Sequence, residues 1–266
     1  MKHFLCTRFN LRNENWVRTK KGEVVLTPEW LSQRYKIFMD YCVPSVINQT
    51  NRNFTWLIFF DIHTPQDFKN SINNFASDTK AFQPLYIDGV KNLQSALKNH
   101  IIGSIDEWDS SVITSRLDND DALHKDFIDT IQNLAQGQKR VIIDVIRGYQ
   151  MNTGKQPFEI RKHFKYYNPF ISLVESVENL KGVYSRDHYK WSSEKNIIAY
   201  RGERLWLEIV HERNMINDVK NQYYLTTKFK GEDFGLKPIK TQDTFYTHCF
   251  NLKLRLKKLY KKIKSS

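Results

Sequence analysis

The sequence predicts an α/β fold built on a mixed, mostly parallel central sheet, and three observations support this prediction. The run TWLIFFD, residues 55–61, is continuously apolar between polar turns, as expected for a parallel strand that is covered on both faces. Strand-like and helix-like segments alternate through the first half of the chain. Polar residues follow three of the predicted strands, at the sheet edge where α/β proteins bind ligands. We therefore expect a layered α/β domain with a site at one edge of its sheet.

The elements are expected in the following order. HFLCTRF, residues 3–9, is a first strand, and a polar connection follows it. The next helix begins after Thr27, whose hydroxyl suits the N-cap, with Pro28 in its first turn. Pro44 then either kinks this helix or opens a short second one. Later, we expect helices at 65–76, 90–102 and from the acidic segment to about 136, and strands at 84–87, 112–117, 139–149, 169–175 and 205–211.

Composition narrows the class of protein. With 266 residues, of which 40% are hydrophobic, the chain can bury one large core. No apolar run approaches the roughly 18 residues that cross a bilayer, and the stretch MKHFLCTRF is too short for a signal peptide. The cysteines, Cys6, Cys42 and Cys249, are odd in number and lack metal-ligand spacing. We expect a cytoplasmic protein with buried thiols.

Positive charge is concentrated at the end of the chain. The segment KLRLKKLYKKIK, residues 253–264, carries seven Lys or Arg and no acid, so without it the net charge falls from +12 to +5. Leucines alternate with these cations, which predicts a basic amphipathic tail over 251–266. Two interpretations stay open: contact with an anionic membrane surface at the inner face of the membrane, or a solubilising helix that frays. Nucleic acid is not an expected partner.

The segment SRLDNDDALHKDF, residues 115–127, places Asp118, Asp120 and Asp121 within four positions. Neighbouring carboxylates raise one another's pKa unless something offsets their charge, and a divalent cation would do so. Mg²⁺ and Mn²⁺ prefer oxygen ligands, and Mg²⁺ is typically held by one or two carboxylates plus phosphates and waters. Capping of the following helix explains one or two acids but not three. The cluster therefore predicts a metal site that binds a phosphate group.

Two segments in the same order resemble one enzyme family. PSVINQTNRNFTWLIFFDIHTP, residues 44–65, is similar to the corresponding stretch of the inverting glycosyltransferases of family 2, with Ser45, Gln49, Thr50, Trp56 and Asp61 in step. LDNDDAL resembles the Leu-Asp-x-Asp-Asp segment of that family, the DXD motif of the GT-A fold. TRFN and RLDNDDA resemble the rhamnosyltransferase branch in particular. The resemblance covers about residues 3–145 well, and Ile62, His63 and Thr64 depart from the family's D-D-G-S turn.

The resemblance implies a GT-A type, Rossmann-like α/β/α sandwich that spans residues 1–250. Its nucleotide-binding half would be about 1–145 and its acceptor half about 146–250, with 251–266 as the tail. It also implies that Mn²⁺ or Mg²⁺ is held by Asp118, Asp120 and His211. For Asp121, a capping role stays open. The donor-binding residues implied are Thr7, Arg8, Asp61, Arg116 and Asp118, with Asp61 at the nucleotide base.

Inversion requires a carboxylate that takes the proton from the acceptor hydroxyl as it attacks the anomeric carbon. Related folds place this acid in the second half, ahead of the metal-binding His. Asp187 in YSRDHYKW fits that order, and Glu203 competes with it. The expected reaction moves a sugar, rhamnose by family analogy, from a nucleoside-diphosphate donor to a polysaccharide or glycolipid acceptor.

Two other functions compete with this one. A nucleotidyltransferase that makes activated sugars uses a similar sheet, but it generally requires a Gly-rich basic loop after the first strand, and residues 10–22 contain only Gly22. A basic nucleic-acid-binding module without catalysis predicts cations spread over one face, whereas here most of the excess lies in the terminal segment.

Overall fold

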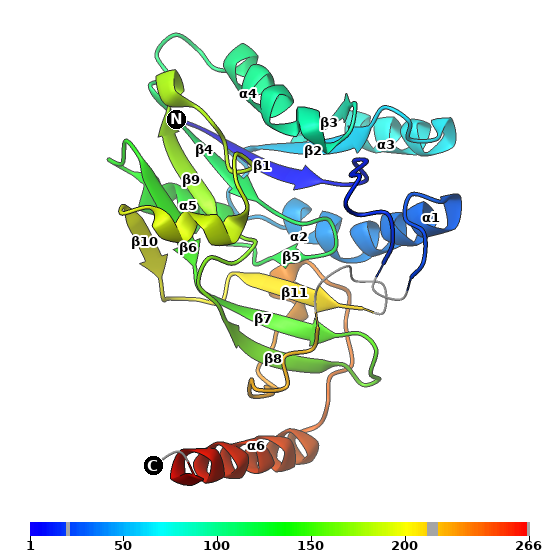
Figure 1. The fold of residues 1–266 in the computed structure, drawn as a ribbon, viewed down its shortest axis with the longest axis vertical. Coiled ribbons are helices and arrows are strands. Elements are labelled where there is room, and N and C mark those ends of the chain that lie inside the picture. The colour runs from blue at the N-terminus through cyan, green and yellow to red at the C-terminus, as the bar shows by residue number, and fades with distance from the viewer. Residues whose placement is uncertain (20–21, 212–217, 265–266) are drawn as a thin grey trace.

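The computed structural model describes residues 1–19, 22–211 and 218–264, which form two sheets, six α-helices and several short helical turns (Figure 1). The strands are β1 (Lys2–Arg8), β2 (Thr55–Asp61), β3 (Phe82–Ile87), β4 (Ser111–Arg116), β5 (Ala122–Leu123), β6 (Val141–Val145), β7 (Arg147–Asn152), β8 (Glu159–Phe164), β9 (Ser172–Ser176), β10 (Ile197–Tyr200) and β11 (Trp206–Val210). The α-helices are α1 (Pro28–Ile37), α2 (Val43–Ile47), α3 (Gln66–Asp78), α4 (Leu93–Ser104), α5 (Phe127–Ala135) and α6 (Thr244–Lys264).

The larger sheet is mixed and mostly parallel. Its strand order in the described residues is β10-β6-β9-β4-β1-β2-β3. Strand β1 pairs in parallel with β2 and β4, β2 with β3, and β10 with β6, whereas β9 runs antiparallel to both β4 and β6. The predicted sheet type is therefore confirmed. Strands β9 and β10 come from the second half of the sequence, so both halves of the chain contribute to this sheet.

Helices cover both faces of the larger sheet. Alternate residues of β2 enter different apolar clusters, because successive side chains of a strand point to opposite faces. Trp56 and Phe60 pack with α1, α2 and α5, whereas Leu57 and Phe59 pack with α4. The continuous apolar run of β2 is explained by this double coverage, and the predicted α/β/α layering is confirmed.

Several local predictions are confirmed at the residue level. The Thr27 hydroxyl accepts a hydrogen bond from the backbone N–H of Trp30 at 3.2 Å, and Pro28 opens α1. Pro44 lies in the first turn of the short helix α2, after a π-helical turn at Phe38–Cys42, so the second of the two options for this proline holds.

Two predicted elements are wrong. The run at 139–149 is not one strand: β6 lies in the larger sheet and β7 in the smaller one, which has the order β5-β11-β7-β8. The chain passes between the sheets at Ile146, whose N–H bonds the Tyr200 carbonyl. The helix after the acidic segment begins only at Phe127, because Ala122 and Leu123 pair with β11 instead.

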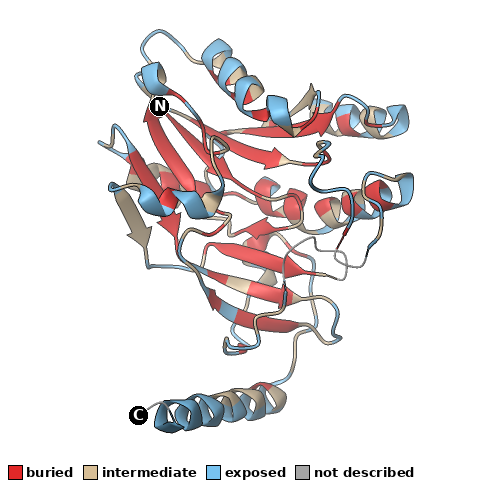
Figure 2. Ribbon diagram, in the orientation of Figure 1, coloured by how far each residue is buried: buried red, intermediate tan, exposed pale blue. Residues whose placement is uncertain are grey.

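The basic tail belongs to a longer helix than predicted. Helix α6 begins at Thr244, where the Asp243 carboxylate accepts a hydrogen bond from the N–H of Tyr246 at 2.7 Å, and it continues to Lys264. Residues 265 and 266 of the predicted tail lie outside the described residues. Figure 2 shows that most of this helix is exposed. Among the described helices, none combines the length and apolar character that crossing a bilayer requires.

Asp144 in β6 makes stability depend on pH. Its carboxylate is fully buried and accepts hydrogen bonds from the N–H of Tyr167 at 2.7 Å and the Asn168 side chain at 3.0 Å. Burial raises the pKa of Asp144 from 3.8 to about 6, despite these bonds. The folded protein thus favours the protonated form of Asp144. The stability that this protonated side chain contributes is therefore complete below pH 3.8 and is lost as pH rises through 6.

We therefore expect the stability of the native protein, relative to Asp144→Asn, to fall by about 2 kcal/mol between pH 4 and pH 7. Urea unfolding of both proteins across this range measures the difference directly. The same comparison with Asp67→Asn, which changes an exposed acid, should be flat. A flat difference for Asp144→Asn as well would contradict the assignment.

Candidate active site

The three strands that end in predicted site residues, β1, β2 and β4, are neighbours in the larger sheet. Because β2, β1 and β4 are adjacent and parallel, their carboxyl ends, at Asp61, Arg8 and Arg116, reach the same edge of the larger sheet. The turn that carries the acidic cluster follows β4 directly. The side chain of Asn119 in this turn donates to the carbonyls of Arg8 and Phe9, both at 2.8 Å. The turn is thereby fastened to the end of β1.

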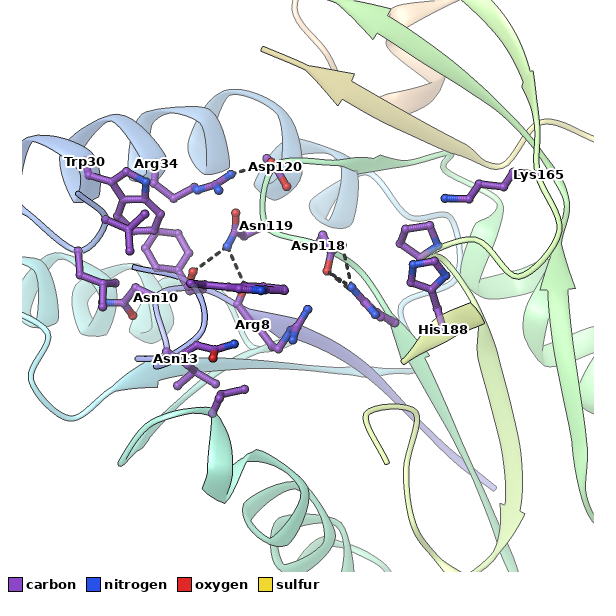
Figure 3. A pocket seen from close by; sticks show the side chains of 18 residues that line it. Arg8, Asn10, Asn13, Trp30, Arg34, Asp118, Asn119, Asp120, Lys165 and His188 are labelled. Atoms are coloured by element: carbon purple, nitrogen blue, oxygen red, sulfur yellow. Dashed lines mark hydrogen bonds and ion pairs between the residues drawn. The ribbon is translucent and has the colours of Figure 1, made fainter. Parts of the chain in front are cut away.

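A cavity of about 240 Å³ opens at this edge (Figure 3). Four of the predicted site residues line it: Arg8, Arg116, Asp118 and Asp120. Figure 3 shows Arg34 and Trp30 on one side of the cavity and Lys165 and His188 on the other. The side chains that were not predicted from the sequence include Trp30, Arg34, Asn119, Lys165 and His188.

Asp120 is the most strongly held acid of the cluster. Its Oδ2 lies 2.6 Å from Nη1 of Arg34 and 3.2 Å from Nε2 of His211, and all three side chains are nearly buried. Burial by itself would raise the pKa of Asp120, but the Arg34 charge and the His211 hydrogen bond outweigh it and hold the pKa well below its ordinary value. Asp120 is therefore an ionised carboxylate at any physiological pH. The predicted proximity of Asp120 and His211, 91 residues apart, is observed.

Asp118 is turned towards a different arginine. It accepts hydrogen bonds from Nε of Arg116 at 3.2 Å and from Nη2 at 3.0 Å. The guanidinium groups of Arg116 and Arg8 both lie over the ring of Tyr184, at 5.5 and 5.1 Å from its centroid. The ring thus supports two cations that face the cavity.

Asp121 does not cap the following helix, so that interpretation is wrong. Its Oδ1 accepts a hydrogen bond from the backbone N–H of Ile209 at 2.9 Å, which ties the acidic turn to β11 of the smaller sheet. Burial, followed by the charges of Asp120 and Glu208, raises the pKa of Asp121 well above its ordinary value. Asp121 therefore holds the two sheets together next to the cavity.

Two predicted donor-binding residues lie outside the cavity lining. The Asp61 carboxylate is buried and accepts hydrogen bonds from the backbone N–H groups of Arg12, His63 and Gly89 and from Nε of Arg12. The Thr7 hydroxyl is also buried and accepts a hydrogen bond from Nε1 of Trp56 at 2.9 Å. Asp61 thus fixes the loop after β1, part of which lines the cavity.

The two candidate bases lie in different places. Asp187 immediately precedes His188, a lining residue, and its carboxylate is half exposed and held by Lys190 at 3.1 Å. Glu203 lies in the connection that enters β11 at the end opposite to His211, and it does not line the cavity. Asp187 does not line the cavity either, but it adjoins the lining residue His188 and lies close enough to Arg116, another lining residue, for the two charges to interact.

His188 is a further candidate base that the sequence did not reveal. Its Nδ1 lies against the Tyr167 carbonyl, so this nitrogen carries a proton and donates it. Burial, followed by the Arg116 charge, lowers the pKa of His188 below its ordinary value. The imidazole is therefore neutral near pH 7, with a lone pair on Nε2 that can accept a proton. The only local signal for it was its position after Asp187.

The donor set is compatible in kind with a divalent cation. Asp120 and His211 present an oxygen and a nitrogen 3.2 Å apart, and Mg²⁺ or Mn²⁺ commonly takes its remaining ligands from phosphates and waters. Among the described residues, no group of three or more His, Cys, Asp or Glu side chains is arranged to hold a metal ion by itself. A cation here would depend on the ligand that it binds, with Asp120 and His211 as its protein ligands.

Solved structures with similar folds include three of Staphylococcus aureus TarS, residues 1–349. The TM-score is 0.45 at 10% identity for one, 0.48 at 12% for a complex with UDP-GlcNAc, and 0.46 at 13% for a complex with UDP. They align over 79%, 84% and 79% of this chain, and over 60%, 63% and 61% of theirs, so the chain spans less than two thirds of their length. No curated protein sequence matches the chain.

A family model gives the decisive comparison. The model described as "Putative rhamnosyl transferase" matches residues 3–223, which is most of the chain and includes every predicted site residue. The resemblance found in the two sequence segments and the predicted enzyme class are thereby confirmed. The chain belongs to the rhamnosyl transferase family and is a glycosyltransferase.

Proposed function

We propose that the protein transfers a sugar, rhamnose by family, from a nucleoside-diphosphate donor to a saccharide or glycolipid acceptor, with inversion and with the help of Mn²⁺ or Mg²⁺. The observation that carries this proposal is the convergence of Asp118 and Asp120 with Arg8, Arg34 and Arg116 in one cavity at the carboxyl ends of β1 and β4. An acid that can hold a cation, Asp120, and arginines that can bind phosphate oxygens are the groups that a departing diphosphate requires.

The cations of the cavity stabilise the leaving group. Negative charge develops on the departing phosphate oxygen as the glycosidic bond breaks, and preorganised positive groups lower the energy of that state. Arg8 and Arg116 are held in place by Tyr184, and Lys165 faces the cavity from the far side. A divalent cation at Asp120 and His211 would supply Lewis-acid stabilisation of the same charge.

Asp187 is proposed as the base that receives the proton of the acceptor hydroxyl. Lys190 and the hydroxyl of Tyr189 lower its pKa below the ordinary value, so the carboxylate is ionised and able to accept a proton at neutral pH. The free thiols of Cys6, Cys42 and Cys249 fit the reducing cytoplasm that we propose as the site of the reaction.

Calorimetric titration with nucleoside diphosphates, with and without Mn²⁺, tests the proposed function. We expect a donor affinity that rises with Mn²⁺, and donor hydrolysis for one nucleotide sugar in a panel that includes rhamnose donors. A nucleotidyltransferase would instead form a nucleotide sugar from a sugar phosphate and a nucleoside triphosphate. Binding of any oligonucleotide, weakened by salt and indifferent to nucleotide sugars, would favour the non-catalytic alternative.

The proposed base predicts a large difference between two conservative substitutions. Asp187→Asn should lower kcat by about a hundredfold or more with little change in donor affinity, because it removes a proton acceptor and keeps the shape of the side chain. Glu203→Gln should leave kcat within twofold, since neither Glu203 nor the residues next to it in the chain line the cavity, whereas Asp187 adjoins the lining residue His188. Steady-state kinetics for both variants decide this. Normal turnover in Asp187→Asn together with loss of turnover in His188→Gln would assign the base to His188.

A further inference from the structure

Helix α6 presents its two faces to different surroundings. One face packs on the smaller sheet and the segment that covers it: the Tyr246 hydroxyl donates to Glu159 at 2.7 Å, and the Asn251 side chain makes paired hydrogen bonds with the backbone of Leu225 at 2.8 and 3.0 Å. The guanidinium of Arg161 lies over the ring of Phe250, and Lys258 lies over Tyr224. The helix is therefore docked in a fixed rotation about its axis.

The opposite face of α6 carries a stripe of exposed apolar side chains. With about 100° per residue, residues spaced alternately by three and four share one face of a helix. The stripe runs along the whole length of α6, and its large side chains are 50–80% exposed. We name the following set the α6 stripe: Phe245, Cys249, Leu252, Leu256, Leu259 and Ile263.

Cations border the α6 stripe on both sides. By the same helical geometry, Lys253 and Lys264 flank it on one side, and Arg255 and Lys262 flank it on the other. The sequence of α6 contains no Asp or Glu, so nothing on the helix itself balances this charge. An exposed apolar band between two rows of cations is the pattern of a helix that lies in the plane of a membrane interface.

We propose that α6 binds an anionic lipid bilayer through the α6 stripe. The apolar side chains enter the boundary between headgroups and acyl chains, and the flanking Lys and Arg contact anionic headgroups. Because the opposite face of α6 is packed against the rest of the protein, binding of the helix brings the whole enzyme to the bilayer surface. This inference concerns a surface away from the cavity and stands whether or not the proposed reaction is right.

Two other occupants of the stripe fit the charges less well. A second copy of the chain would match the alternate spacing of three and four, but the positions beside the stripe would then place Lys and Arg opposite like charges. Nucleic acid would attract the cations but would leave the apolar stripe in water. Only an anionic bilayer uses both features.

Co-sedimentation with vesicles tests the proposal, without any nucleotide sugar. The protein should bind vesicles of phosphatidylcholine with one third phosphatidylglycerol, bind vesicles of phosphatidylcholine alone at least tenfold more weakly, and lose binding as salt rises. Since each removed cation costs about fivefold in affinity, a triple cation variant should lose roughly a hundredfold. The variants are Leu252→Ser/Leu256→Ser/Leu259→Ser for the stripe and Lys253→Gln/Arg255→Gln/Lys262→Gln for the cations.

Matched control variants change the same chemistry elsewhere. Trp108→Ser removes an 82% exposed apolar side chain, and Lys80→Gln/Lys98→Gln/Lys139→Gln removes the same charge from other exposed positions. Both controls should bind vesicles within twofold of the native protein. Equal loss in the control and α6 cation variants would overturn the proposal, because binding would then follow net charge alone.

Cys249 offers a direct readout of the docked face. It is exposed at the edge of the α6 stripe, whereas Cys6 and Cys42 are buried, so a polarity-sensitive thiol dye labels this one position in the folded protein. Its emission should shift to the blue on anionic vesicles. Any of three results would overturn the proposal: no shift on vesicles, a shift caused by an oligonucleotide, or sedimentation that shows a dimer formed through the stripe. Donor hydrolysis is also measured in the same variants. It tests the transferase assignment separately from the membrane proposal.

Discussion

Replacing Asp120 by Asn is expected to lower kcat/KM by about a thousandfold and to abolish the effect of Mn²⁺ on donor affinity. The substitution keeps the shape of the side chain but removes the ionised carboxylate that meets Arg34 and His211. It therefore replaces the charged carboxylate ligand of the proposed cation by a neutral amide, which binds a cation more weakly, and it leaves the cavity with excess positive charge. Steady-state kinetics and calorimetry with a nucleoside diphosphate, each with and without Mn²⁺, measure both effects.

Asp67→Asn is the control for this variant, because it removes one exposed acid from α3 and leaves the cavity untouched. Circular dichroism and the melting temperature show whether Asp120→Asn stays folded, since Arg34 is nearly buried and loses an ionic partner. A folded Asp120→Asn protein with native turnover would refute the role of this acid. The unaltered enzyme could also keep its native turnover after divalent cations are chelated. In that case the arginines alone would stabilise the charge on the departing diphosphate.

Replacing Trp206 by Ala is expected to cost about 3–5 kcal/mol of unfolding free energy, the largest effect that we predict on stability. Trp206 opens β11, is 1% exposed and stacks on Phe170 with ring centroids 4.8 Å apart. Its Nε1 donates to the Val145 carbonyl at the end of β6, at 2.6 Å. The side chain thus joins the smaller sheet to the larger one, and its loss leaves a cavity and removes one of the two hydrogen bonds that the Val145 carbonyl accepts, the other coming from Asn168.

Urea unfolding measures this cost, and Trp108→Ala supplies the matched control. Trp108 is 82% exposed, so its truncation should change the unfolding free energy by less than about 0.5 kcal/mol. Gly148 gives an independent check on the same packing, because a Cβ at this position would lie 2.0 Å from the Trp206 ring. Tolerance of Gly148→Ala would show that the interface is looser than described.

The individual elements followed from the sequence because their signals are local. The apolar run of β2, the Thr27 cap and the proline at the start of α2 each depend on residues a few positions apart. The same local patterns cannot reveal where a chain leaves one sheet for another. The local pattern of residues 139–149 predicts one strand, yet the chain passes from one sheet to the other at Ile146.

The acids of the site were visible in the sequence, but most of their partners were not. Asp118 and Asp120 stand out as a cluster, and the family resemblance added His211 and Arg116. Arg34 resembles any other cation of an amphipathic helix until α1 packs beside the acidic turn, 86 residues away.

The sequence by itself determined the α/β class, the family and the identity of the acids, because these depend on periodicity and on short motifs. Only the tertiary structure decided that Asp120 meets Arg34, that Asp121 ties the sheets together instead of capping a helix, and that His188, the neighbour of Asp187 in the chain, lines the cavity. The physical reason is that an ion pair needs two side chains within a few ångströms. Strand order and helix packing set that distance between residues far apart in the chain, and no local pattern encodes it.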